Sequence, residues 1–171
     1  MTVSLMIAFS FVEKPMSWQE SDKYCKEMGA RIIGINSREE NEAIVAEIRR
    51  RGYNRTNKFF WIGMTDKDEE GIWKLASNDK NASYLNWATN RGARPEPNNH
   101  AGNEHCALLR TGGCSEWDHS GWADYDCSKK YLKITCTAKH GGIISDTTYS
   151  MNALCEFETK AGDTIKWLID Y

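Results

Sequence analysis

Polar side chains with oxygen donors gather in three short, loop-like stretches of the chain. These stretches are Glu96-Pro97-Asn98, Glu104-His105-Cys106 and Trp122-Ala123-Asp124. Carboxylate and carboxamide oxygens are hard ligands, which suit Ca²⁺ rather than zinc or copper. Oxygens that bind calcium and still take part in hydrogen bonds can also hold a ligand that itself supplies hydroxyl groups. The three stretches therefore indicate a calcium site that is open to such a ligand.

The composition limits the chain to one domain and excludes several partners. With 171 residues, it has the size of a single domain that buries its own core. The formal net charge of −2 provides no basic field for nucleic acid. No apolar run reaches the length of a membrane span. We interpret the apolar residues 3–12 as a first strand, with an atypical secretion signal as the alternative.

The six cysteines indicate disulfide bonds and an oxidising compartment, since none of them forms a C-x-x-C pair typical of zinc ribbons or thioredoxin-type sites. Two glycosylation sequons, Asn54-Arg55-Thr56 and Asn81-Ala82-Ser83, agree with a secreted or extracellular glycoprotein. The spacing alone leaves the pairing of the cysteines open. They stand at positions 25, 106, 114, 127, 136 and 155.

Two helices are predicted in the first third of the chain, each opened by a serine followed three residues later by a glutamate. Ser17 begins a helix over residues 18–28, and Gly29 ends it. Ser37 begins a second helix that ends near residues 49–52. The inward faces are expected to hold Trp18, Ser21, Tyr24, Cys25 and Met28 in the first helix, and Ala43, Ile44 and Ile48 in the second.

The remaining chain predicts short strands around a long irregular region. Helical periodicity is absent between residues 65 and 124, where Gly, Asn, Asp and Pro are dense, and irregular segments of that length are usually functional. The tail 159–171 either adds a strand or frays. We predict a single domain over residues 1–171, with its core at 9–158. Strands are expected at residues 9–12, 31–35, 59–64, 107–109 and 154–157.

Seven ordered motifs resemble a C-type lectin-like domain, and the match runs from about residue 9 to residue 158. The resemblance implies an α+β fold with two helices, small antiparallel sheets and a long calcium-binding loop region, held by disulfides. It also implies a lectin that binds carbohydrate and is not an enzyme. The motifs are Trp61-Ile62-Gly63, Gly71-x-Trp73, Tyr84-x-x-Trp87, Glu96-Pro97-Asn98, Gly102-x-Glu104-x-Cys106, Trp122-x-Asp124-x-x-Cys127 and Cys155-Glu156.

The resemblance implies two disulfides, Cys25–Cys155 and Cys106–Cys127. The two cysteines left over suggest a third, Cys114–Cys136, which is our own hypothesis. Residues 128–152 form a longer segment than the family usually has there, and the sequence provides no physical account of it.

The same resemblance implies a ligand set for calcium, made of Glu96, Asn98, Glu104 and Asp124. Glu96, Asn98 and Glu104 would also bind carbohydrate, because a sugar hydroxyl accepts a hydrogen bond from an amide and donates its proton to a carboxylate. Pro97 resembles the cis proline of the family. The order acid-proline-amide is similar to that of lectins for mannose, N-acetylglucosamine, glucose or fucose.

The main departure from the family pattern is Ala123, which stands where an asparagine is usual. The missing amide would cost ~1–2 kcal/mol, or about five- to thirty-fold in affinity for sugar. Water, Asn99 or Asn103 are the alternatives that could replace it. A protein-binding domain of the same fold that has lost sugar binding therefore stays open as a second hypothesis.

An auxiliary calcium site is a weaker expectation. Asp66 and Glu70 match family ligands, whereas Asn99 and His105 stand where acids are usual. The alternative is that Asp66 and Glu70 belong to a solvated acidic loop that binds no ion.

Enzyme chemistry finds little support in the sequence. Bound calcium would keep Glu96 and Glu104 ionised, so neither would be the proton donor of a glycosidase. The four histidines, at positions 100, 105, 119 and 140, lack the spacing of a metal motif. His100 and His105, which flank the proposed site, are interpreted as loop polar residues, with a pH-dependent release of calcium through their protonation as the alternative. The expected partners are glycans or glycoproteins, with no nucleic acid and no membrane span. A homo-oligomer is an open alternative, because single shallow sites bind weakly and several copies add avidity.

Overall fold

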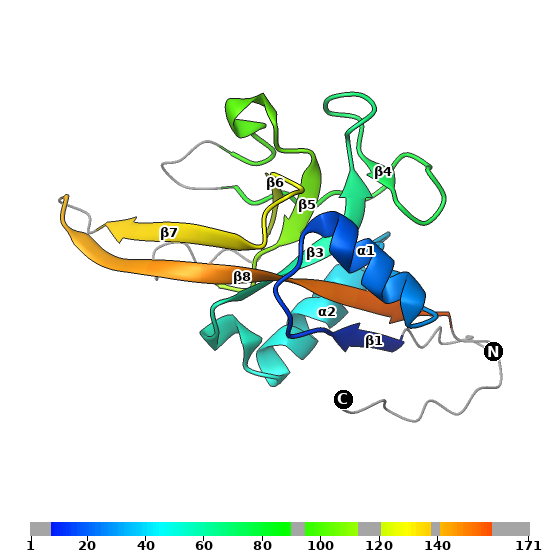
Figure 1. Ribbon diagram of the computed structural model, residues 1–171, viewed down its shortest axis with the longest axis horizontal. Helices are drawn as coiled ribbons and strands as arrows, with labels where there is room; N and C mark the ends of the chain where they lie inside the picture. The colour runs from blue at the N-terminus through cyan, green and yellow to red at the C-terminus, as the bar shows by residue number, and fades with distance from the viewer. Residues whose placement is uncertain (1–7, 90–94, 113–120, 138–140, 159–171) are drawn as a thin grey trace.

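The computed structural model describes residues 8–89, 95–112, 121–137 and 141–158. Within these ranges no helix is both long and apolar enough to cross a membrane. The described chain has the α+β architecture expected, with two α-helices packed against a mixed sheet (Figure 1). The helices are α1 (Trp18–Glu27) and α2 (Arg38–Arg50), and the strands are β1 (Ala8–Phe11), β2 (Arg31–Ile32), β3 (Lys58–Thr65), β4 (Lys74–Leu75), β5 (Cys106–Leu109), β6 (Trp122–Tyr125), β7 (Tyr131–Thr137) and β8 (Ile143–Phe157).

Helix α1 begins at the capping box predicted from its sequence. The hydroxyl of Ser17 accepts a hydrogen bond from the backbone N–H of Glu20 at 3.2 Å, and the Glu20 carboxylate accepts one from the backbone N–H of Ser17 at 2.8 Å. Trp18, Ser21 and Cys25 are buried as expected. The prediction was wrong for Met28, which is 41% exposed because it follows the last turn and lies beyond the covered face.

Helix α2 is also capped as predicted, since the hydroxyl of Ser37 accepts a hydrogen bond from the backbone N–H of Glu40 at 3.1 Å. Ile44 and Ile48 are buried, but Ala43 is exposed, so its place on the inward face was wrong. Asn41 completes the buried stripe instead. Its side-chain oxygen accepts a 3.0 Å hydrogen bond from the indole of Trp122, which satisfies both buried polar groups.

Strand β8 organises the sheet. It pairs antiparallel with β1, β2 and β7 and parallel with β3, and the main strand order is β1-β8-β3-β5-β6. In Figure 1 it runs as a long orange ribbon across the molecule. The expected small antiparallel sheets are thus joined by one strand, and the β3–β8 pair is parallel instead. The strand predicted at 154–157 is only the end of β8.

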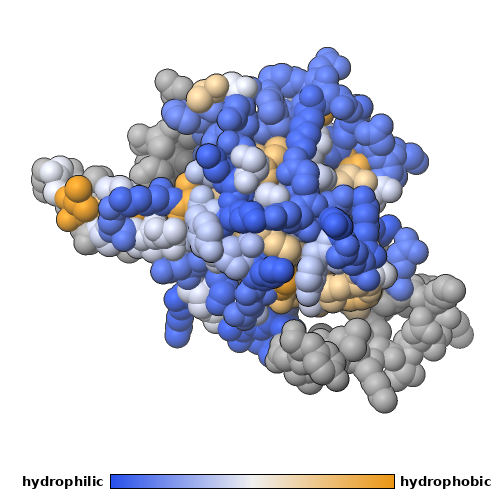
Figure 2. All heavy atoms as spheres, in the orientation of Figure 1, coloured by the Kyte–Doolittle hydropathy of each residue, from blue (hydrophilic) through white to orange (hydrophobic). Residues whose placement is uncertain are grey.

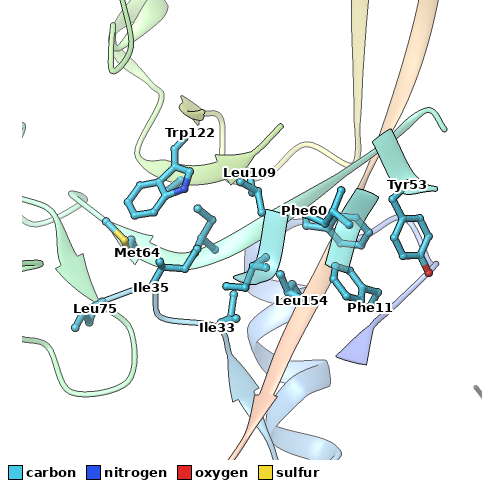
Figure 3. Packing of buried hydrophobic residues seen from close by; sticks show 14 of the residues in the cluster. Phe11, Ile33, Ile35, Tyr53, Phe60, Met64, Leu75, Leu109, Trp122 and Leu154 are labelled. Atoms are coloured by element: carbon cyan, nitrogen blue, oxygen red, sulfur yellow. The ribbon is translucent and has the colours of Figure 1, made fainter. Parts of the chain in front are cut away.

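The sheet has a core on each face, which explains the continuous apolar run of β3. Phe60, Ile62 and Met64 belong to one buried cluster, whereas Phe59 and Trp61 belong to the other. Successive side chains of a strand point to opposite faces, so a strand covered on both sides has no polar alternation. Figure 3 shows the first cluster, where Phe60 packs beside residues from the first and last strands and from the segment before β3; Phe11, Leu154 and Tyr53 are labelled there.

Two disulfides that the family resemblance implied are confirmed. Cys25–Cys155 joins α1 to β8, and Cys106–Cys127 joins the start of β5 to the chain that follows β6. Cys114 lies outside the described residues. Cys136 is buried and is not a free thiol, so its pairing with Cys114 stays a prediction.

The long segment at 128–152 is now accounted for as a β-hairpin. Strand β7 pairs with the first half of β8 from Tyr131↔Ser150 to Thr137↔Ile143. This hairpin extends from the body of the molecule as an arm in Figures 1 and 2. Tyr131 and Ile143 are 57% and 73% exposed. Neither β7 nor the first half of β8 was predicted from the sequence.

Candidate calcium and ligand site

The site is assembled where the loop at 95–105 folds against strand β6. Asp124 lies on β6, and the β5–β6 register places it opposite Ala107, shortly after that loop. The Asp124 side chain is buried, and its two carboxylate oxygens accept hydrogen bonds from the backbone N–H groups of Asn98 at 2.9 Å and Asn99 at 2.6 Å. Asp124 therefore fixes the loop that carries the other predicted ligands.

Glu96 and Asn98 form the acid–amide pair that the sequence predicted. The side-chain amide of Asn98 donates a 2.8 Å hydrogen bond to the Glu96 carboxylate. The peptide bond between Glu96 and Pro97 is cis, as the resemblance implied. One donor and one acceptor thus lie side by side, which is the arrangement that a hydroxyl group needs for recognition.

Glu104 is held in the same loop by two backbone contacts. Its carboxylate accepts a 2.9 Å hydrogen bond from the backbone N–H of His100, and its own N–H donates to the side-chain oxygen of Asn99 at 3.1 Å. Asn99 and Ala101 have φ values of +41° and +58°, in the left-handed region that residues other than glycine rarely adopt. Such backbone strain persists where the surrounding structure enforces it, often at functional sites.

The carboxyl groups of this site repel one another in the absence of a cation. Burial, followed by the hydrogen bond and negative charge of Asp124, raises the pKa of Glu96 to about 8, although Arg110 opposes the rise. Burial and the charge of Asp124 also raise the pKa of Glu104. Three carboxyl groups therefore share a region with too little positive charge, and a hard divalent cation held by their oxygens would supply it. On this observation the residues present fit calcium.

The amide missing at Ala123 is not replaced by either neighbour that the sequence suggested. Ala123 is 5% exposed on β6, opposite Leu108 of β5. The side-chain amide of Asn99 donates to Glu70 at 2.6 Å, and that of Asn103 donates to Asp126 at 3.1 Å. Both amides are thus engaged with other carboxylates, so among the described residues the site has one acid–amide pair, at Glu96 and Asn98.

The predicted auxiliary residues lie together, with one addition. Asp66 and Glu70 come after β3, and Asn99 reaches them through its hydrogen bond to Glu70. His105, which stands where an acid is usual in the family and was interpreted as a loop polar residue, lies within this group. Its Nδ1 is 3.0 Å from Oδ1 of Asp66 and 3.5 Å from Oε2 of Glu70.

Comparison with known proteins decides the family. A family model described as the lectin C-type domain matches residues 14–138. The chain belongs to the C-type lectin domain family. This membership confirms the predicted family and fold class, whereas the calcium ligands and the sugar class stay predictions.

The relatives of this C-type lectin domain include larger proteins. Asialoglycoprotein receptor 2 of Mus musculus is 33% identical over 104 residues, which cover 60% of this chain and 32% of that protein. CD209 antigen-like protein 2 of Macaca mulatta is 28% identical over 140 residues, which cover 78% of this chain and 48% of that protein. The chain thus spans less than half the length of these two relatives.

Solved structures agree on the fold. The carbohydrate-recognition domain of mouse scavenger receptor C-type lectin has a TM-score of 0.60 at 23% identity and covers 90% of this chain and 92% of its own. The corresponding domain of cow CD23, solved in the presence of a GlcNAc2Man3 oligosaccharide, has a TM-score of 0.59 at 20% identity and covers 91% and 90% of the two chains. At these identities the likeness shows the C-type lectin fold and nothing finer.

Proposed function

We propose that this domain binds carbohydrate in a calcium-dependent way, with a preference for mannose, N-acetylglucosamine or fucose-type glycans. The observation that carries the proposal is the Glu96–Asn98 acid–amide pair, held beside the carboxyl groups of Asp124 and Glu104. Membership of the C-type lectin family supports carbohydrate binding in general. The order acid-proline-amide at 96–98 supports the narrower sugar class.

The side chains have separate tasks in this proposal. Glu96, Asn98, Glu104 and Asp124 would hold the calcium ion, which when bound attracts the oxygens of two neighbouring sugar hydroxyls. The amide of Asn98 donates a hydrogen bond to one hydroxyl oxygen, and the carboxylates of Glu96 and Glu104 accept hydrogen bonds from the hydroxyl groups. Because these hydrogen bonds need fixed directions, the backbone contacts that hold Asp124 and Glu104 serve recognition as well as folding.

The same proposal includes a binding role without catalysis, because the proposed binding of a glycan involves hydrogen bonds and no proton transfer. We also propose a secreted or extracellular location for this glycoprotein. The Cys25–Cys155 and Cys106–Cys127 disulfides support that location, because such bonds persist in oxidising compartments. The sequon residues Asn54 and Asn81 are both exposed, as glycosylation would require.

Retention on immobilised mannose tests the proposal. The domain is expected to bind mannose-agarose in millimolar calcium and to elute with EDTA. Glu104→Gln removes a proposed ligand and is expected to abolish retention. Glu42→Gln, which changes an exposed carboxylate on α2, is the matched control and should be retained like the native protein. Retention that survives EDTA, or that survives Glu104→Gln, would contradict the proposal.

A protein-binding domain that has lost sugar binding is the second candidate, and Ala123 is the observation that favours it. The described part of the chain provides no second acid–amide pair, since the amides of Asn99 and Asn103 donate to Glu70 and Asp126. This candidate predicts calcium uptake by calorimetry without retention on mannose, N-acetylglucosamine or fucose resins. A glycan array in calcium buffer separates the two candidates across all sugar classes at once.

A further inference from the structure

One group of metal-binding side chains lies beside the proposed calcium site and differs from it in chemistry. Ligand atoms of Asp66, Glu70 and His105 all lie within 4.8 Å of one another. We propose that these three residues bind a zinc-class transition-metal ion. This site would be separate from the carbohydrate-binding calcium site and independent of the function proposed above.

The sheet register brings the two ends of this group together. Thr65 of β3 pairs with Cys106 of β5, so Asp66 and His105 are the next residues outward on facing strands. The backbone N–H of Asp66 donates to the carbonyl of His105 at 3.3 Å. The disulfide Cys106–Cys127 follows His105 directly, which restrains the position of the imidazole. Two ligand residues are therefore placed by the fold itself.

A tight turn after Asp66 brings Glu70 back beside Asp66 and His105. The backbone N–H of Gly71 donates to Oδ2 of Asp66 at 2.9 Å, and Gly71 has a φ of +81°, which favours glycine. This contact also orients the Asp66 carboxylate, so that Oδ1 faces the imidazole, as backbone and side-chain partners commonly orient metal ligands. The side chains of Asp66, His105 and Glu70 are 1%, 31% and 56% exposed, which leaves one side of the group open for an ion to enter.

The distances suit a small ion. Zinc binds imidazole nitrogen and carboxylate oxygen at ~2.0–2.2 Å, so tetrahedral ligand atoms lie about 3.3–3.6 Å apart. Nδ1 of His105 is 3.0 Å from Oδ1 of Asp66 and 3.5 Å from Oε2 of Glu70. Small side-chain adjustments would bring the three atoms to those separations. A water molecule would complete the four positions.

The same group is poorly suited to calcium, although the resemblance to the family suggested a calcium ion here. Calcium takes about six to eight oxygen ligands, whereas an imidazole nitrogen is typical of zinc and related ions. Asn99 does not supply the missing oxygen, because its Oδ1 accepts from the backbone of Glu104 and its Nδ2 donates to Glu70. The donor set of one nitrogen and two carboxylates therefore favours a transition metal.

Calorimetric titration with zinc in millimolar calcium tests this proposal, after dialysis against a chelator. The native domain is expected to take up one zinc ion in addition to calcium. His105→Ala should weaken that zinc binding by more than about 100-fold, because even the loss of a supporting partner costs about 10–100-fold. His100→Gln is the matched control, since it removes a neighbouring histidine that is outside the group, and its zinc affinity should be unchanged.

Two further measurements separate the loss of the zinc site from misfolding and from effects on the calcium site. Cobalt(II) should give the visible absorption of a four-coordinate site in the native domain but not in His105→Ala, with folding checked by circular dichroism. Glu96→Gln should lose calcium binding and keep zinc binding, which separates this site from the proposed lectin site. Absence of zinc uptake by the native domain, or equal uptake by His105→Ala, would show that His105 only hydrogen-bonds to Asp66 and would overturn the proposal.

Discussion

Lowering the pH from about 9 to about 6 should weaken calcium binding, and Glu96 should set the size of the effect. Burial and the neighbouring Asp124 raise the pKa of Glu96 to about 8 in the calcium-free protein. Calcium requires the carboxylate, so below that pH a proton must leave before the ion binds. The apparent affinity should then fall about tenfold per pH unit, to about 100-fold below its plateau at pH 6.

The stability of the calcium-free protein should change in the opposite direction. The pKa of Glu96 is raised on folding, so between about pH 4.5 and 8 the native state holds a proton that the unfolded state has released. Stability is then fully present below the unfolded pKa and is lost as the pH rises through the folded pKa. The free energy of unfolding should fall by at most about 1.4 kcal/mol per pH unit over this window. Bound calcium would compensate the charge and should remove the loss.

Isothermal calorimetry across this pH range measures both the affinity and the number of protons released. At about pH 6.5, titrations in buffers of different ionisation enthalpy should reveal close to one proton released per calcium ion, and at about pH 9 close to none. Glu42→Gln, which alters an exposed carboxylate on α2, should leave the profile unchanged. A calcium affinity that is the same at both ends of the range would refute the placement of Glu96 among the ligands.

Three further perturbations test other parts of the structure. Ala123→Asn should strengthen binding of a mannose-type sugar about five- to thirty-fold, measured by titration in calcium, and an unchanged affinity would count against the missing amide as the defect. Gly63→Ala should lower the free energy of unfolding by about 1–3 kcal/mol in urea, because the new Cβ would lie 2.8 Å from the carbonyl oxygen of Ile32; native stability would mean that the backbone yields easily. Replacing Cys25 and Cys155 by serine should cost about 5 kcal/mol of stability, because the disulfide closes a loop of 130 residues; a change below about 1 kcal/mol would show that the unfolded chain is little constrained by it.

The parts of the fold that depend on local chemistry were predictable from the sequence. Both helix starts follow from a serine and a glutamate three residues apart, and the structure shows the corresponding capping hydrogen bonds. The wrong assignments lie at the margins of the helical faces, at Met28 and Ala43. The spacing of apolar residues predicts which stripe of a helix faces inward. The neighbouring helices and strands decide how wide the covered face is.

The hairpin of β7 and β8 carried a signal that the sequence interpretation missed. Leu132, Ile134 and Cys136 are less exposed than the residues between them, which is the period-two pattern of a strand with one covered face. Gly141-Gly142 then precedes β8 as a turn signal. The alternation of apolar and polar residues over 132–136 is therefore sufficient to predict a strand here.

The contacts of the site are likewise of two kinds, local ones that the sequence could predict and long-range ones that it could not. The Glu96–Asn98 pair is two residues apart, so a motif could predict it, and the structure places the two side chains in contact. The contact of His105 with Asp66 spans 39 positions and depends on the pairing of Thr65 with Cys106. No spacing rule for metal motifs contains that register, so the sequence placed His105 where an acid is usual in the family without predicting its contact with Asp66. The sequence shows that His105 stands where the family usually has an acid. The pairing of the facing strands is needed to show that this histidine lies beside Asp66 and can bind a metal with it.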